Sequence, residues 1–195
     1  IISVENYTKG KIDGKICFEN VNFKGTGFIR AEFVNCIFRN CDLELVDFNA
    51  SYFEDCIFEG ILKETWFRGG YKFNNDEKEF GIPKKNKMKN VSFVKAELIS
   101  VNFSNNCDLS MIAMPNKGKY IKISNWGGFL KNLCMRNINF DEKEKRELDI
   151  FCEVYSVYAA NQNDYIYNFH DLAGEYGFEI AEYLWSEMEK WKEII

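Results

Sequence analysis

The sequence predicts a mainly β fold, a quadrilateral parallel β-helix of about four coils with projecting loops and a C-terminal α-helical cap. Three observations predict it. Large apolar residues recur every five positions between Ile16 and Gly60. Mostly small residues stand two positions before each of them, and from Asp141 onward the apolar residues change to helical spacing.

The five-residue spacing does not fit an ordinary helix or strand, whose apolar faces repeat about every 3.6 and every 2 residues. The chain must instead turn a corner every five residues, and four such sides close a coil of about twenty residues. Stacked coils pair as parallel strands about 4.8 Å apart, so residues i and i+20 should lie above one another. Each Phe buried between coils contributes about 1.5–3 kcal/mol. The predicted core consists of the central residues Phe18, Phe23, Phe28, Phe33, Phe38, Leu43, Phe48, Phe53 and Phe58.

This stretch resembles the pentapeptide-repeat family. Repeats of that family have a central Phe or Leu, a small residue two positions before it, and often Asn or Asp just before it. The runs CDLEL, VDFNA and VNFKG match the pattern well, whereas TGFIR and AEFVN match it more loosely. The resemblance implies that the β-helix is right-handed.

The five-residue spacing is interrupted after Gly60. Lys63 occupies a position that should be apolar, and residues 74–90, with Pro83 and five lysines, predict a projecting loop. Residues 115–119 predict a second loop, followed by a short strand at 120–124. Two further repeat fragments are expected, with centres at Phe93, Leu98, Phe103, Leu109 and Met114, and then at Leu130, Met135 and Phe140.

Residues 141–195 predict a helical domain behind a β-helical domain of residues 1–140. Asp141 and Glu144 form a predicted capping box, and the apolar spacing that follows predicts an amphipathic helix over 142–160. Residues 161–164 predict a turn. Residues 165–193 predict more helix, which Gly174 and Gly177 weaken and split. We expect these helices to cap the coils, and a surface for a partner or a homodimer is a compatible alternative.

Charge is unevenly distributed along the sequence. Residues 16–62 carry eight acids and three bases, a net charge of −5; residues 74–140 carry five acids and eleven bases, or +6; residues 141–195 carry fourteen acids and five bases, or −9. A rod with acidic side chains can imitate duplex DNA in charge and shape. The candidate partner-binding residues are Glu44, Asp47, Glu54, Asp55, Lys84, Lys85 and Lys87. An ordinary solvated charged face is the alternative.

The sequence shows no pattern that predicts catalysis, and we expect neither an enzyme nor a cofactor or metal. His170 is the only histidine, and no P-loop or H-E-x-x-H run occurs. Cys36, Cys41 and Cys56 stand at the small, inward positions of the repeats, and the seven cysteines include no C-x-x-C pair. We therefore expect reduced thiols and a cytoplasmic location. No signal peptide and no membrane span is expected.

The predicted function is that of a non-enzymatic protein-binding module or inhibitor. The resemblance adds a narrower alternative, because quinolone-resistance members of the family look like DNA and bind the bacterial type II topoisomerase. This chain departs from those members in its long helical part and its basic middle. Direct nucleic-acid binding through the basic segment 74–140 is the third and least favoured hypothesis.

Overall fold

The computed structural model describes residues 16–73, 75–85, 87–136 and 140–194. Its contacts divide the chain into two compact units, which we call unit 1 (Ile1–Gly118) and unit 2 (Lys119–Ile195). The division lies before the boundary that we expected at 140/141, because residues 120–134 pack with the C-terminal elements. The two units are described separately.

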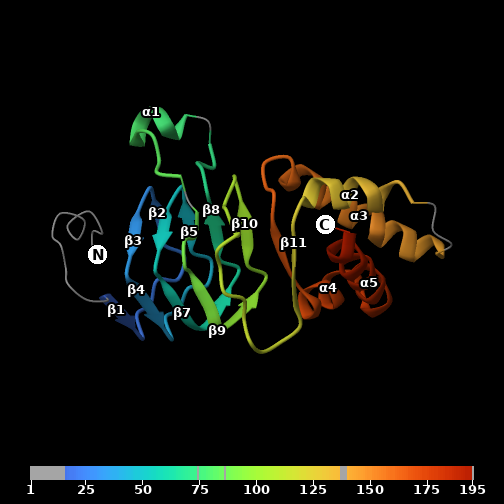
Figure 1. Ribbon diagram of the computed structural model, residues 1–195, viewed down its shortest axis with the longest axis horizontal. Helices are drawn as coiled ribbons and strands as arrows, with labels where there is room; N and C mark the ends of the chain where they lie inside the picture. Colours follow the sequence, from blue (N-terminus) through green and yellow to red (C-terminus); the bar gives the residue numbers. More distant parts are fainter. Residues whose placement is uncertain (1–15, 74, 86, 137–139, 195) are drawn as a thin grey trace. The chain divides into compact units, whose positions relative to one another are not determined.

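The described residues of unit 1 form short parallel strands and one short helix (Figure 1). The strands form three sheets, ordered β1-β4-β7-β9, β10-β8-β5-β2 and β3-β6. Their bounds are β1 (Ile16–Glu19), β2 (Gly27–Ile29), β3 (Glu32–Val34), β4 (Cys36–Arg39), β5 (Asp47–Asn49), β6 (Tyr52–Glu54), β7 (Ile57–Lys63), β8 (Trp66–Arg68), β9 (Ser92–Ile99) and β10 (Asn102–Ser104), with α1 (Asp76–Phe80) between β8 and β9.

The strand register places each central residue above the one twenty positions earlier. Phe38 lies opposite Phe18 in the β1–β4 pair and opposite Phe58 in the β4–β7 pair. The three rings are stacked, with centroids 5.1 and 4.9 Å apart. Phe28 and Phe48 are paired in the same way, as are Phe33 and Phe53. The spacing of five therefore produces a core of stacked rings, as the sequence predicts.

Left-handed backbone makes the corners between strands. The second residue after a central residue has a positive φ at most corners, for example 55° at Asn20, 56° at Asn35 and 49° at Asn40. Asn, Asp and Gly adopt this conformation at the lowest steric cost, because their side chains are short or absent. Their recurrence at this position is thus the local reason that the chain turns every five residues.

The coil continues beyond Gly60, with one residue fewer on its next side. Leu62 rather than Lys63 takes the inward position, where it is buried and pairs with Leu98. Phe67 then pairs with both Phe48 and Phe103. The expectation that the repeat fails at this point is wrong, because Gly60, with a φ of 104°, shortens the corner and shifts the register by one residue.

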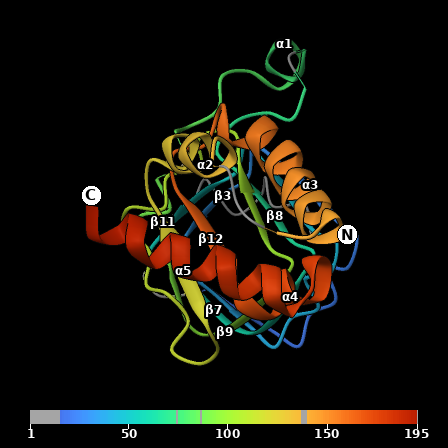
Figure 2. The ribbon, with the colours of Figure 1, turned by 90° about the vertical axis from the view of Figure 1, so that its right-hand side faces the viewer.

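Unit 2 combines a two-stranded antiparallel sheet with four helices (Figure 2). The predicted short strand and the predicted 142–160 helix are confirmed. Asp141 accepts a hydrogen bond from the Glu144 backbone N–H at 2.8 Å and donates its own N–H to Glu144 Oε2 at 3.0 Å. The elements are β11 (Tyr120–Ile123), α2 (Trp126–Cys134), α3 (Glu142–Ala159), β12 (Tyr165–Asn168), α4 (Phe169–Tyr176) and α5 (Phe178–Ile194).

Two expectations for this part of the chain are wrong. Residues 126–134 form α2 and not a third repeat fragment, because Trp126, Phe129, Leu130 and Leu133 have helical spacing and are all buried. Residues 165–168 form a strand, because they pair with β11 before Asn168 begins α4. The predicted split of the last helical stretch does occur, at Gly177, where φ is 87°.

None of the described helices is both long enough and apolar enough to cross a membrane. The core of unit 2 instead gathers aromatic and aliphatic side chains from all six of its elements. That the helices cap the coils of unit 1 stays a prediction.

Candidate protein-binding surface

The outward side chains of unit 1 form rows in which acids and bases alternate from coil to coil. Glu44 lies between Lys24 and Lys63, and it accepts a hydrogen bond from each. These two ammonium groups lower the pKa of the Glu44 carboxyl to about 2. On another side Arg39 lies between Glu19 and Glu59, and Lys95 adds a fourth charge 3.0 Å from Glu59. The row of Arg39 is therefore neutral, and in the row of Glu44 the single acid is paired with two bases.

The other predicted acids also have partners within unit 1. Asp47 accepts a hydrogen bond from Arg68 Nε at 2.9 Å, and Arg68 itself is buried and lies over the Trp66 ring. Glu54 accepts hydrogen bonds from Lys89 and from the Tyr52 hydroxyl, and both lower the pKa of its carboxyl.

Asp55 accepts a hydrogen bond from the Asn90 amide at 2.9 Å. All four acids that the sequence suggested as a mimic of DNA are therefore ion-paired or hydrogen-bonded with a basic or amide group of the same chain. Several acidic residues of 16–62 therefore form ion pairs with basic residues of 74–140.

The predicted basic residues fall into two groups. Lys84 lies 3.6 Å from the centre of the Tyr52 ring and 3.4 Å from Glu32 Oε2, so that it is held against the coils. Burial, followed by the nearby Glu54 carboxylate, raises the pKa of Tyr52 to about 12. Lys85 and Lys87 are exposed. Lys84 thus holds the loop against the coils, whereas Lys85 and Lys87 face solvent.

The segment that carries these lysines leaves the stack after β8 and returns before β9. We call residues 69–90 the projecting segment; residues 74 and 86 of it are not described. In Figure 1 the segment extends beyond the ends of the strands, with α1 at its tip. None of the α1 side chains is buried. The projecting segment corresponds to the predicted loop at 74–90.

Polar contacts to the coils fix the backbone of the projecting segment. Arg30 of the coils donates to the carbonyl of Phe80. Within the segment itself, the Tyr71 hydroxyl donates to the carbonyl of Gly81 at 2.7 Å. Asn49 accepts from the Lys72 N–H at 2.8 Å and donates to Asp76 Oδ2 at 3.3 Å. The segment is therefore positioned by hydrogen bonds rather than by a core of its own.

Two large apolar side chains of the projecting segment face solvent. Phe73 is 60% exposed and Ile82 is 77% exposed. Neither residue was expected from the sequence to be a binding residue. One weak feature of the sequence could have indicated them: each is an apolar residue in an otherwise polar and charged stretch. A backbone that is held in place while apolar side chains stay exposed is the arrangement expected of a docking site.

Helix α3 of unit 2 presents a second set of apolar residues. Leu148 and Phe151 are buried, whereas Ile150, Val154 and Val157 are exposed. The exposed set is centred on a different face of the helix from the buried set, because neighbouring residues are about 100° apart. A partner or a homodimer at these C-terminal helices stays a prediction.

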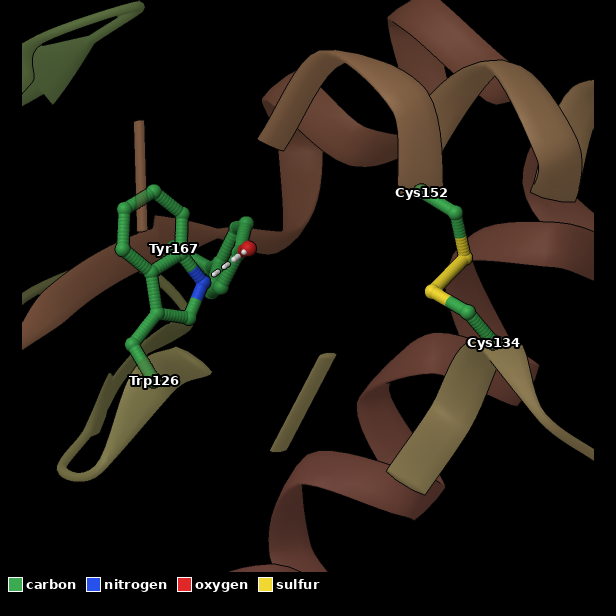
Figure 3. The surroundings of a disulfide bond; sticks show 4 residues. All are labelled: Trp126, Cys134, Cys152 and Tyr167. Atoms are coloured by element: carbon green, nitrogen blue, oxygen red, sulfur yellow. Dashed lines mark hydrogen bonds between the residues drawn. A yellow bond between two sulfur atoms is a disulfide. The ribbon is translucent and has the colours of Figure 1, made fainter. Parts of the chain in front are cut away.

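A disulfide joins α2 to α3 in unit 2 (Figure 3). It links Cys134, which is exposed, to Cys152, which is half-buried. The expectation that the thiols are reduced is therefore wrong for this pair, which could not be identified from the spacing of the cysteines. The expectation of a cytoplasmic location loses that support, because disulfides persist mainly in oxidising compartments.

Three buried cysteines and His170 are the next side chains whose chemistry has to be considered. Cys36, Cys41 and Cys56 are buried at the inward small positions, and Cys56 Sγ lies 3.3 Å from the Phe33 carbonyl. His170 is exposed in the first turn of α4. Within the described residues, no group of three or more His, Cys, Asp or Glu side chains is placed to hold a metal ion.

Comparison with known proteins identifies the repeats. Residues 16–55 match the family described as Pentapeptide repeats, in eight copies. No curated protein and no solved structure matches the chain. Pentapeptide repeats imply a β-helix and are generally non-enzymatic structural or binding elements, and the parallel sheets of unit 1 agree with that fold. Residues 16–55 of the chain are thus pentapeptide repeats.

Proposed function

We propose that this chain is a protein-binding module whose partner docks on the projecting segment of unit 1. The observation that carries the proposal is the exposure of Phe73 and Ile82 on a backbone that hydrogen bonds from Arg30 and to Asn49 hold to the coils. A positioned loop loses little conformational entropy on binding, so most of the energy of burying its apolar side chains is available for affinity.

The chemistry of the segment defines the kind of partner. Phe73 and Ile82 fit apolar pockets, which provide most of the binding energy at protein interfaces. Lys85 and Lys87 are exposed on the same segment, so acidic groups at the rim of those pockets would complement them. The proposed partner is thus a protein surface with apolar pockets and an acidic rim.

A comparative capture experiment tests the proposal. The tagged full chain, the double variant Phe73→Ser/Ile82→Ser and the control Met111→Ser are incubated with extract of the source cells, and bound proteins are identified by mass spectrometry. Met111 is 47% exposed in unit 1 outside the projecting segment, so its substitution removes a comparable apolar side chain. We expect a protein that binds the wild type and the control but not the double variant. If the same proteins bind all three, the segment is not the docking site.

The two alternative functions receive less support from the charges. A DNA mimic needs acids that remain available, yet Glu44, Asp47, Glu54 and Asp55 all have partners within the chain. Direct nucleic-acid binding needs free basic side chains, and Lys84 and Lys89 are used against the coils. Replacing the four acids with Lys tests mimicry, because it should abolish any competition with DNA for a target enzyme. A mobility shift of DNA at low salt tests direct binding.

We also propose that the strands of unit 1 close into right-handed quadrilateral coils, about four in number. The twenty-residue register between central residues supports four sides of five residues. The bridge between Asn22 and Asp42 supports a side between the β1–β4 and β2–β5 pairs. A crystal structure of the full chain tests both the shape and the hand.

A further inference from the structure

Helix α3 has an apolar face in addition to the one that enters the core of unit 2. Leu148 and Phe151 belong to the core, whereas Ile150, Val154 and Val157 are 38%, 44% and 72% exposed. The exposed residues are spaced four and then three positions apart. This is the spacing by which helices pack side by side in coiled coils. The exposed face of α3 is therefore suited to binding another helix.

Two charged side chains lie along one edge of this face. Arg146 and Glu153 are both exposed, and they stand seven positions apart. Seven residues make about two turns of a helix, so the two side chains lie on the same edge. Ile150 lies near the middle of the interval between them. The edge is thus basic before Ile150 and acidic after it, which makes it complementary to a reversed copy of itself.

We propose that α3 binds α3 of a second copy of the chain in antiparallel orientation, about a two-fold axis close to Ile150. This axis places Arg146 of each copy opposite the partner's Glu153, so that the contact contains two ion pairs. Ile150 packs on the partner's Ile150 between them. A two-fold axis makes the interface closed and isologous, so that association ends at a dimer.

The partner also covers the other apolar residues of the face. With the axis close to Ile150, Val154 and Val157 lie against the first turns of the partner's helix. Lys143 is exposed and lies on the same face of α3, because it stands eleven positions, or about three turns, before Val154. Its alkyl stem extends over the partner's Val157. The most exposed of the three apolar residues is therefore removed from water in the dimer.

The charges favour this arrangement over its alternatives. A shift of the partner by one heptad in one direction places Glu153 opposite the partner's Glu153, and a shift in the other direction places Arg146 opposite the partner's Arg146. A parallel pair of helices places Lys143 beside the partner's Lys143 and Glu147 beside the partner's Glu147. Each of these alternatives brings like charges together, which costs free energy. The antiparallel arrangement about Ile150 brings opposite charges together instead.

A charge-swap experiment on the full chain tests the proposal. Molar mass is measured by sedimentation equilibrium for the wild type, for Arg146→Glu, for Glu153→Arg and for the double variant Arg146→Glu/Glu153→Arg. We expect a wild-type dimer. The dissociation constant should rise by roughly tenfold or more in each single variant, because each places like charges opposite one another. The double variant should dimerise like the wild type, since its two charges have only changed places.

Lys145→Glu is the matched control. It reverses the charge next to Arg146, but Lys145 stands nine positions before Val154 and therefore lies on the opposite side of the helix. We expect it to leave the dimer unchanged. Ile150→Ser, at the axis, should weaken the dimer without any change of charge. Circular dichroism of all variants confirms that the fold is retained.

Three outcomes overturn the proposal: a monomeric wild type, a dimer that neither single charge reversal weakens, or a double variant that stays dissociated. The experiment is separate from the capture assay, because Phe73→Ser/Ile82→Ser should leave the dimer intact. Failure of one proposal therefore does not imply failure of the other.

Discussion

Unit 1 and unit 2 build their cores in different ways. In unit 1 each buried ring meets the equivalent ring of the next coil, and buried hydroxyls bond to backbone carbonyls, as Thr65 does to Leu43 at 2.9 Å. In unit 2 the core joins residues without any repeat: Trp126 stacks on Tyr165 with centroids 4.2 Å apart and donates to the Tyr167 hydroxyl at 2.8 Å (Figure 3). Periodic packing repeats one type of contact from coil to coil, whereas the core of unit 2 is built from many different contacts.

The largest expected effect is the loss of unit 1 through Phe38→Asp. The substitution places an unpaired carboxylate between the rings of Phe18 and Phe58, and we expect it to cost roughly 5 kcal/mol or more. Urea unfolding checks it, followed by the strand signal in circular dichroism and, in a Trp66→Phe background, by the fluorescence of the three remaining tryptophans, which all lie in unit 2. Phe18→Asp at the half-buried end is the matched control and should cost less. A fully stable Phe38→Asp variant would contradict the stacked-coil fold.

An intermediate effect is expected from removing the disulfide of unit 2. Cys134 and Cys152 are 18 residues apart, and Cys134→Ser/Cys152→Ser should destabilise unit 2 by about 2–4 kcal/mol while unit 1 keeps its stability. Urea titrations of the oxidised, the reduced and the double-variant protein measure this. The reduced wild type should unfold like the variant. Equal stability of all three would mean that packing alone holds α2 and α3 together.

The smallest expected effect is a pH dependence that belongs to unit 1. The pKa of Glu44 is lowered to about 2 by Lys24 and Lys63, against about 4.3 for an unfolded chain. Its ion pairs therefore stabilise the fold fully above about pH 4.3, and this contribution falls as the pH approaches 2. The difference in melting temperature between wild type and Glu44→Gln should shrink from pH 6 to pH 2. A difference that stays constant over this range would argue against a charged Glu44 pair.

The predictable part of the fold was the part with a regular period. Phe18 to Phe58 occupy the positions that the spacing indicated, because each central residue faces a strict geometric requirement. The spacing shortens by one residue after Gly60, so the five-residue pattern did not identify Leu62 and Phe67 as core residues. Both nevertheless pair with central residues of neighbouring coils. The family match ends at residue 55, although the stack goes on.

Contacts between distant residues could not be predicted in unit 2. Leu130 fits a five-residue spacing with Met135 as well as a helical spacing with Trp126 and Leu133, and only packing decides between them. The strand at 165–168 depends on its pairing with residues 120–123. The candidate site was located only in part, because the sequence indicated a projecting loop but not which of its side chains the hydrogen bonds to Arg30 and Asn49 would leave exposed.

The left-handed corners of unit 1 have a consequence for how such a chain can grow. The extra residue at Asn105 and Asn106 lies at such a corner, with both φ values positive. Sides cannot lengthen without moving a ring out of its column, but a corner has no inward side chain to displace. New peptide can therefore be spliced in at corners such as Asn35 or Asp55, which makes the coil stack a frame for displaying foreign sequences.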